Sequence, residues 1–184
     1  DGVVYTEPSF FHIFDYKLLE GNKATALSKV NSLVITQSAA KQFFGNESPM
    51  GKTLRFLRSD RFVDCIITGV MEDFPANSHI HFKYLIAYEG LPVWMKHFWY
   101  LHEAYTYVLL QPGASVAAIE NGFPALAEKY KTADALRSKK WAIKLVPLTD
   151  VHLNPQKGYE PEIKGNKLSL ITLAVIAFVI LITA

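Results

Sequence analysis

One stretch decides the fold of this chain, Leu33-Val34-Ile35-Thr36-Gln37-Ser38-Ala39-Ala40-Lys41-Gln42-Phe43-Phe44-Gly45. The run 33–36 is aliphatic and β-branched, which predicts a strand. From Gln37 onward the apolar residues recur at helical spacing, so a helix is predicted over about 37–44. Gly45 is a natural C-terminal cap for that helix. The sequence therefore predicts a strand that passes directly into a helix.

Extended patterns dominate the residues after this element. Residues 46–51 are rich in turn formers, 52–57 alternate in polarity and 62–70 are strongly apolar, which predicts two paired strands. Residues 73–78 are again turn-like, and an extended pattern resumes over 80–87. Residues 91–100 carry an aromatic cluster that we expect in a core or an interface. The middle of the chain is therefore predicted to be rich in strands.

The two flanks each suggest a strand and a helix. Val3-Val4-Tyr5 predicts the end of a strand, and Pro8 opens a short helical stretch with Phe10, Phe11, Ile13 and Phe14 on one buried face. Gly21-Asn22 ends this N-terminal unit. Residues 105–110 predict a strand, Ser115 is a plausible N-cap for a helix that reaches about residue 130, and 141–146 predict another strand. The predicted fold class is α+β: a split, ferredoxin-like layer built from both flanks, with the strand-rich middle as an insertion.

Composition limits the possible functions. The chain has 184 residues, half of them hydrophobic, so it can bury a sizeable core. Its 19 Lys and Arg balance 17 Asp and Glu and are scattered, so nucleic-acid binding is not supported. Cys65 is the single cysteine and lies in an apolar run, where a buried thiol is expected. An intrachain disulfide is therefore excluded.

The C-terminal run 168–184 is apolar and carries no charge. At about 1.5 Å per residue it rises roughly 26 Å, just short of the about 30 Å of a bilayer core. We expect it to be the start of a transmembrane helix, because a buried helix of a globular core usually keeps a polar face. The chain begins with Asp1 and stops inside this run, which suggests a fragment cut at both ends. Charge does not settle the sidedness of the helix.

Chemical motifs are present but incomplete. Residues 49–53, Pro-Met-Gly-Lys-Thr, are similar to the tail of a phosphate-binding loop, but the spacing requires a glycine where Asn46 stands. His79 and His81 would share one face of a strand, and Asp73 or His152 would complete a metal site only if the fold brought them close.

Catalytic constellations are equally weak. Ser78 precedes His79 without a nucleophile elbow, and the carboxylate pairs Glu72-Asp73 and Glu160-Glu162 lie in turn-like or linker-like stretches. We therefore assign no catalytic, cofactor-binding or metal-binding residue. The chain is not expected to be an enzyme.

Four landmarks in order resemble one family. They are residues 34–54, residues 68–79 (Thr-Gly-Val-Met-Glu-Asp-Phe-Pro-Ala-Asn-Ser-His), the strand around 105–108, and residues 148–153 (Leu-Thr-Asp-Val-His-Leu). Together they resemble the periplasmic core domain of MacB-like, FtsX-like ABC transporter permeases. The resemblance implies a two-part domain with these segments: 1–32, the first part of a porter-like subdomain; 33–103, an inserted sabre-like subdomain; 104–153, the second porter-like part; 154–167, a linker; and 168–184, the start of the membrane helix.

The resemblance also implies a function. It implies the periplasmic domain of a permease subunit in the bacterial inner membrane, transmitting ATP-driven motion for export or envelope mechanotransmission. The implied partners are a cytoplasmic ABC ATPase, fused or separate, which would bind the ATP, and a second permease copy that makes a dimer. The resemblance leaves room for a periplasmic adaptor or a lipoprotein as a further partner, and it implies no cofactor in this part of the protein.

Two other classes of protein compete with the permease. An extracytoplasmic sensor domain of a membrane receptor would also place an α/β domain before a membrane helix. The segment after Ala184 would discriminate the two, because a permease continues into further membrane helices and a sensor into a signalling helix and kinase. A membrane-anchored enzyme would need a pocket with convergent polar groups.

Overall fold

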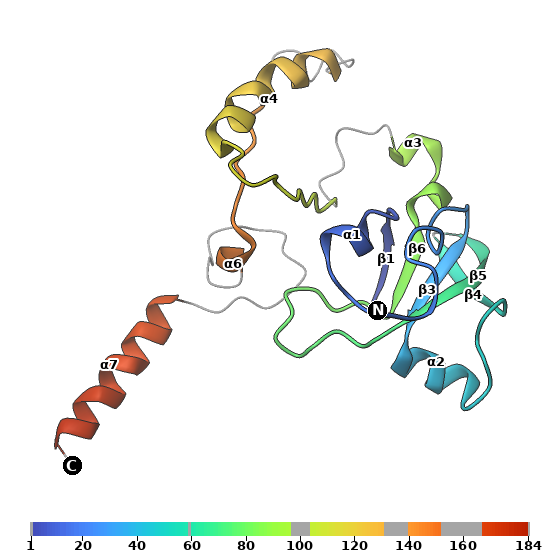
Figure 1. Cartoon of the computed structure of the whole chain (residues 1–184), viewed down its shortest axis with the longest axis horizontal. Helices are drawn as coiled ribbons and strands as arrows, with labels where there is room; N and C mark the ends of the chain where they lie inside the picture. The colour runs from blue at the N-terminus through green and yellow to red at the C-terminus, as the bar shows by residue number, and fades with distance from the viewer. Residues whose placement is uncertain (1, 59, 97–103, 131–139, 152–166, 184) are drawn as a thin grey trace. The chain divides into compact units, whose positions relative to one another are not determined.

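The computed structural model describes residues 2–58, 60–96, 104–130, 140–151 and 167–183 (Figure 1). For residues 167–170 and 183 it describes the backbone alone. The chain divides into two compact units, Asp1–Val108 and Leu109–Ala184.

The first unit is built on a mixed sheet. Its elements in chain order are β1 (Val3–Thr6), α1 (Phe10–Ile13), β2 (Leu18–Gly21), β3 (Ser32–Thr36), α2 (Gln37–Phe44), β4 (Thr53–Arg58), β5 (Arg61–Met71), β6 (Tyr84–Ala87), the 3₁₀ helix η1 (Tyr88–Gly90) and α3 (Val93–Lys96). The strand order is β1-β6-β3-β5-β2, and β4 pairs with β5 beside this path. The pairs β1/β6 and β3/β5 are parallel, whereas the other pairs are antiparallel. The predicted combination of helices and strands is confirmed in the coarser form of a mixed α/β structure with a mixed sheet.

Successive side chains of a strand point to opposite sides of the sheet. Each side of this sheet carries its own core cluster. On one face Phe10 and Phe11 of α1, together with Leu27, pack against Val34 and Met71. On the other face Ala39 of α2 lies in a cluster built on β3 and β5, with the buried members Leu33, Ile35, Cys65, Ile67 and Val70. The sheet is therefore the middle layer of the first unit.

The strand and helix that decide the fold lie where the sequence predicts them. All five residues of β3 are buried. The N-terminus of α2 is capped by Thr36, whose hydroxyl accepts a bond of 3.4 Å from the Ala39 amide. Gly45 has a φ of 61°, and its amide donates to the Lys41 carbonyl at 3.0 Å. The predicted Gly45 cap is therefore confirmed, and the Thr36 cap is a further feature that satisfies an amide the helix leaves unpaired.

The paired strands after α2 are also confirmed. β4 and β5 form an antiparallel hairpin in which Leu54 lies opposite Cys65 and Phe56 lies opposite Val63. These four residues belong to the α2 side of the core or pack against it. The last predicted strand of this region is shorter than expected, since β6 begins at Tyr84 and not at Ile80.

The N-terminal flank contributes to the same sheet. β1 and α1 lie where the sequence predicts a strand and a helical stretch. The sequence did not predict β2, whose four residues are half-buried or exposed and give no clear alternation. Because β1 and β2 share one sheet with β3 to β6, residues from 1–32 and 33–103 form a common layer. The division into porter-like and sabre-like parts stays a prediction.

The second unit contains α4 (Val116–Tyr130), α6 (Leu148–Val151) and α7 (Lys167–Thr183). The predicted N-cap of α4 is confirmed, because the Ser115 hydroxyl accepts a bond of 3.2 Å from the Ala118 amide. The short helix α6 was not predicted. The predicted linker, 154–167, lies outside the described residues except for its last residue, which begins α7.

Two strand predictions are wrong. Neither 105–110 nor 141–146 is a strand in the part of the chain that the structure describes. An alternating sequence becomes a strand only where a neighbour supplies the ladder hydrogen bonds. The Leu145 amide instead donates 2.7 Å to the Glu120 carboxylate of α4. Two of the strands on which the predicted ferredoxin-like layer depends are therefore not formed in the described residues.

α7 is the apolar helix expected near the C-terminus, and it has 17 residues. Among the helices described, none combines the length and apolarity needed to cross a membrane. The predicted membrane helix stays a prediction.

Candidate coupling site

The phosphate-loop-like residues 49–52 lie in the turn between α2 and β4, and Thr53 begins β4. The Gly51 amide donates to the Ile67 carbonyl at 2.8 Å, and the Ile67 amide donates to the Lys52 carbonyl at 2.9 Å. A phosphate loop needs amides that point at its ligand. Here the turn amide of Gly51 joins the turn to β5, and the Lys52 ammonium pairs with Glu47. The structure therefore uses this motif as a turn.

The candidate metal ligands have structural contacts. His81 Nε2 lies 3.0 Å from the Pro75 carbonyl, and His79 Nε2 lies 3.2 Å from the Tyr107 hydroxyl. Asp73 accepts from the Ser38 hydroxyl at 2.6 Å and from the Ser38 amide at 3.2 Å, at the first turn of α2. The two histidines do not lie on a strand. Across the described ranges no three metal-binding side chains are grouped, and His152 lies outside these ranges.

The candidate catalytic residues are likewise part of the scaffold. The Ser78 hydroxyl contacts the Tyr16 hydroxyl at 2.9 Å. The Glu72 carboxylate accepts from the Lys17 amide at 3.2 Å. Burial raises the pKa of the Cys65 thiol, which opposes formation of a reactive thiolate. The pair Glu160-Glu162 lies outside the described residues.

A small hollow lies beside the ends of β1 and β6. It has a volume of about 210 Å³ and is lined by Glu7, Pro8, Ser9, Leu27, Tyr88 and Glu89. Sites for small molecules usually enclose about 300–1,000 Å³. The hollow is therefore too small for a ligand of ordinary drug or metabolite size.

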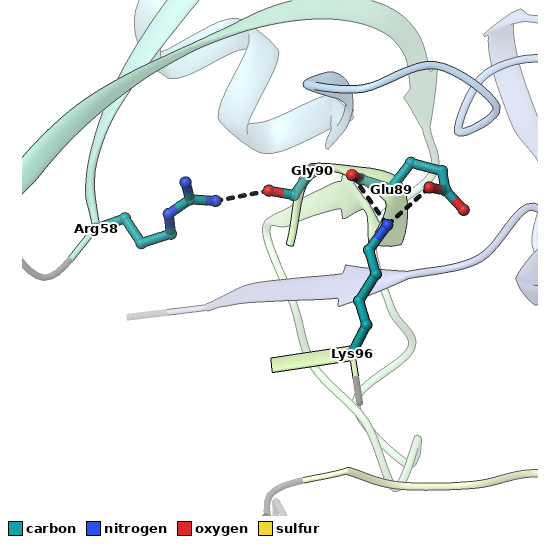
Figure 2. Close-up of polar contacts among 4 residues, drawn as sticks. All are labelled: Arg58, Glu89, Gly90 and Lys96. Carbon is teal, nitrogen blue, oxygen red and sulfur yellow. Dashed lines mark hydrogen bonds and ion pairs between the residues drawn. The ribbon is translucent and has the colours of Figure 1, made fainter. Parts of the chain in front are cut away.

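Two basic side chains hold η1 beside this hollow (Figure 2). Arg58, at the end of β4, donates 2.7 Å to the Gly90 carbonyl. Lys96, at the end of α3, donates 2.7 Å to the Glu89 carboxylate and 3.2 Å to the Glu89 carbonyl. The Lys96 ammonium also lies 5.4 Å from the centre of the Tyr88 ring. Charge-assisted bonds of this kind are among the stronger polar contacts, so they fasten η1 to both β4 and α3.

An aromatic group holds the last residues of the first unit, and we call Phe14, His79 and Tyr107 the Tyr107 anchor. The Tyr107 ring meets the Phe14 ring edge-on at a centroid distance of 4.9 Å and the His79 ring at 5.5 Å. Behind Phe14, the rings of Tyr16 and Phe74 are in contact at 4.6 Å. Residues 104–108 end the first unit. Tyr107 is thus the point at which the chain leaving the sheet domain is held by its core.

Sequence reasoning missed the Tyr107 anchor. It treated Tyr107 as part of a strand and His79 as a possible metal ligand. The two residues are 28 positions apart. Local periodicity carries no information about a contact over that separation, so only the fold could bring the pair together.

Comparisons with known proteins give one family match and similar solved structures. The family model described as MacB-like periplasmic core domain matches residues 1–126. One similar structure is a domain of a "putative Permease protein" from Porphyromonas gingivalis, with a TM-score of 0.59 and 28% identity, covering 79% of this chain and 67% of that chain. Another is the periplasmic region of MacB from Actinobacillus actinomycetemcomitans, with a TM-score of 0.45 and 19% identity, covering 75% of this chain and 58% of that chain. No curated protein matches the chain.

Proposed function

Because the chain belongs to the MacB-like periplasmic core domain family, we propose that it is the periplasmic domain of an ABC transporter permease subunit. In this proposal the domain transmits ATP-driven motion for export or envelope mechanotransmission. The observation that carries the proposal is the family match over residues 1–126, which includes the whole sheet domain. The similarity to a Porphyromonas gingivalis domain described as part of a permease supports the same class.

The proposal places the protein in the bacterial inner membrane with the sheet domain in the periplasm. We propose that α7 is part of a membrane helix. Its residues from Leu168 onward carry no charge, so every side chain tolerates a hydrocarbon environment. The predicted porter-like and sabre-like parts belong to the same proposal.

The Tyr107 anchor gives the proposed transmission a physical route. A pull on the chain after Val108 acts on Tyr107, whose ring is held by Phe14 and His79. The centre of the Phe14 ring in turn lies 5.1 Å from the centre of the Phe10 ring, and Phe10 is a buried residue of the sheet core. Closely packed interiors transmit displacement because they compress little. A movement that starts at the membrane would therefore shift the sheet domain as a body.

The proposed partners come from the family. They are a cytoplasmic ABC ATPase that binds the ATP, a second permease copy, and an adaptor or lipoprotein on the periplasmic side. The domain itself would carry out no chemistry and bind no cofactor. The family match favours the permease over an extracytoplasmic sensor domain.

The first experiment tests sidedness and partnership in the full-length protein. Glu47 is exposed beside α2, so a Glu47→Cys variant should react with a membrane-impermeant maleimide in intact cells whose outer membrane is permeable to the reagent. When the full-length protein is then purified from these cells, an ATPase with an intact phosphate-binding loop should co-purify with it. Labelling only after lysis, or a receptor kinase in place of the ATPase, would overturn the proposal.

A second experiment tests transmission. Residues 154–166 connect the domain to α7, and we expect their replacement by a flexible Gly-Ser segment to leave ATP hydrolysis intact. If the domain moves with ATP, the Glu47→Cys labelling rate should change on ATP addition when the natural segment is present. This change should disappear in the Gly-Ser variant, because a flexible chain transmits little force. A Gly-Ser variant that keeps this ATP response would contradict the proposed route.

A further inference from the structure

The β4–β5 hairpin has a second face that the core does not use. Leu54, Phe56, Val63 and Cys65 point toward the α2 side of the sheet. Because side chains alternate along a strand, the residues between them point the opposite way. We call these residues the outer hairpin face; they are Thr53, Arg55, Leu57, Phe62, Asp64 and Ile66.

Three of the six residues of the outer hairpin face are large, apolar and exposed. Leu57 is 65% exposed, Phe62 is 69% exposed and Ile66 is 52% exposed. Leu57 and Phe62 lie opposite each other near the turn of the hairpin, and Ile66 lies on the same face beyond the next cross-strand pair. Exposed apolar residues gathered on one face in this way are a feature of interaction surfaces. Figure 1 shows β4 and β5 side by side within the sheet.

The patch is divided by an ion pair. Arg55 Nε lies 2.6 Å from Asp64 Oδ1, and Arg55 Nη2 lies 2.9 Å from Asp64 Oδ2. The Arg55 side chain is 64% exposed and the Asp64 side chain is 50% exposed. Both charges are therefore available to groups that approach the outer hairpin face.

The register makes this face self-complementary. Leu57 lies opposite Phe62, Arg55 opposite Asp64, and Thr53 opposite Ile66. Consider a two-fold axis that lies just outside the outer hairpin face, parallel to the strands and above the line midway between β4 and β5. Rotation about this axis places β4 of one copy over β5 of the other, so that each residue faces the cross-strand partner of its own equivalent. In two hairpins packed face to face about that axis, Arg55 of each copy meets Asp64 of the other, and Leu57 meets Phe62. Aligned packing of two sheets in this way is a common arrangement.

We propose that the outer hairpin face is a contact between two copies of this chain. A self-complementary surface is what a two-fold interface requires, and here it combines opposite charges with matched apolar residues. The inference rests on the proposed function in one respect, because that function supplies the second copy of the permease. The face has six residues, far fewer than the roughly 20–30 residues that each partner contributes to a stable complex. The contact therefore forms between copies that the membrane already holds near each other, at high effective concentration.

Complementary charge reversal tests the contact in the full-length protein in membranes. Arg55→Asp places two carboxylates on one face, and Asp64→Arg places two guanidinium groups there. Each variant alone should lose the contact between its own copies. When the two variants are co-expressed, each carboxylate of one copy meets a guanidinium of the other, so mixed pairs should form although both chains lack the intrachain ion pair.

The readout is a bismaleimide cross-link between two reporter positions that the two-fold axis brings together. One chain carries Thr53→Cys and the other carries Ile66→Cys, each combined with one of the charge variants. We expect at least a fivefold lower cross-linking yield for each charge variant with itself than for wild-type charges, and recovery in the mixed pair. The double variant R55D/D64R should cross-link with itself as the wild-type charges do.

Three results would overturn the inference: equal cross-linking of all combinations, no cross-linking at wild-type charges, or no recovery in the mixed pair. Circular dichroism of each variant shows that the domain is folded. Differently tagged copies that still co-purify with the ATPase while these cross-links fail would remove the hairpin contact and leave the proposed function standing. Loss of co-purification with the ATPase would contradict the proposed function instead.

Discussion

The hydroxyl of Tyr107 lies 3.2 Å from Nε2 of His79, and the two rings meet at a centroid distance of 5.5 Å. This contact ties the last residues of the sheet domain to the loop before β6. The Tyr107 ring also packs edge-on against Phe14, which has no contact with the hydroxyl among the contacts described. The two contributions can be measured separately.

We predict that Tyr107→Ala lowers the free energy of unfolding by about 1–3 kcal/mol, because a half-buried ring and its aromatic contacts are lost. Tyr107→Phe keeps the ring and should cost only about 1 kcal/mol, the usual value of one hydrogen bond. Tyr105→Ala is the matched control, since Tyr105 is 46% exposed, and it should change stability by less than about 0.5 kcal/mol. Urea denaturation measures all three. Equal losses for Tyr107→Ala and Tyr105→Ala would show that the Tyr107 anchor contributes nothing.

Local signals in the sequence predicted the elements that depend on local physics. β3, α2 and the Gly45 cap lie where predicted because apolar periodicity and capping chemistry act within a few residues. The β4–β5 hairpin was predicted for the same reason, since its strands are adjacent in sequence. The family resemblance added the class of protein, which the match over residues 1–126 confirms.

Longer-range features could not be predicted in this way. Residues 105–110 have a strand-like pattern, but the pattern does not say whether a partner strand lies alongside. Trp94 belongs to the aromatic cluster expected in a core or an interface; it is 64% exposed, so it is not a core residue of the described part, and its place in an interface stays a prediction. The Tyr107 anchor joins segments that only the sheet brings together. For residues 105–110 and for the Tyr107 anchor, pairing across the fold and not residue type decided the structure.

Asp73 is a residue whose role changes from candidate ligand to helix support. Its carboxylate accepts from the amide and the hydroxyl of Ser38 at the first turn of α2. A carboxylate there satisfies an unpaired amide and interacts favourably with the helix dipole. We predict that Asp73→Ala lowers the free energy of unfolding by about 1–2 kcal/mol. Asp73→Asn, which keeps an acceptor, should cost less.

Thermal and urea denaturation of the Asp73 variants should be compared with Asp60→Ala. Asp60 is an exposed residue of the turn between β4 and β5, so its replacement should have an effect within about 0.5 kcal/mol. Zinc should give Asp73→Ala and the wild type the same shift in midpoint. A zinc-dependent stabilisation present only in the wild type would restore Asp73 as a metal ligand.

The Arg55–Asp64 pair predicts a dependence on pH. The hydrogen bond from Arg55 lowers the pKa of Asp64 below its ordinary value, which is about 3.9. A carboxyl with a lowered pKa in the folded state adds stability that is present above that ordinary value and is lost as pH falls through the folded-state pKa. We therefore expect the pair to persist unchanged from pH 8 to about pH 5.

Carboxyl-carbon NMR can follow this titration in the wild type and in Arg55→Gln. The pKa of Asp64 should rise toward about 3.9 in the variant. Glu47 is an internal control, since its pKa is lowered by the hydrogen bond from Lys52 and not by Arg55. An Asp64 titration that Arg55→Gln does not move would show that Arg55 is not the cause.

Cys65 gives a final prediction, on the opening of the sheet. The residue is fully buried on β5 and in contact with the α2 side of the core, and burial raises the pKa of its thiol. At pH 8 the thiolate fraction should therefore be smaller than for a free cysteine with a pKa of about 8.5. We expect thiol reagents to modify the native protein at least 100-fold more slowly than the protein in denaturant, because labelling requires the sheet to open. Ser48→Cys, at an exposed turn position, should react at the rate of a free thiol under both conditions. A native Cys65 that reacts as fast as the Ser48→Cys thiol would mean that β5 separates from α2 in the folded protein, and the rigid body on which the proposed transmission depends would be lost.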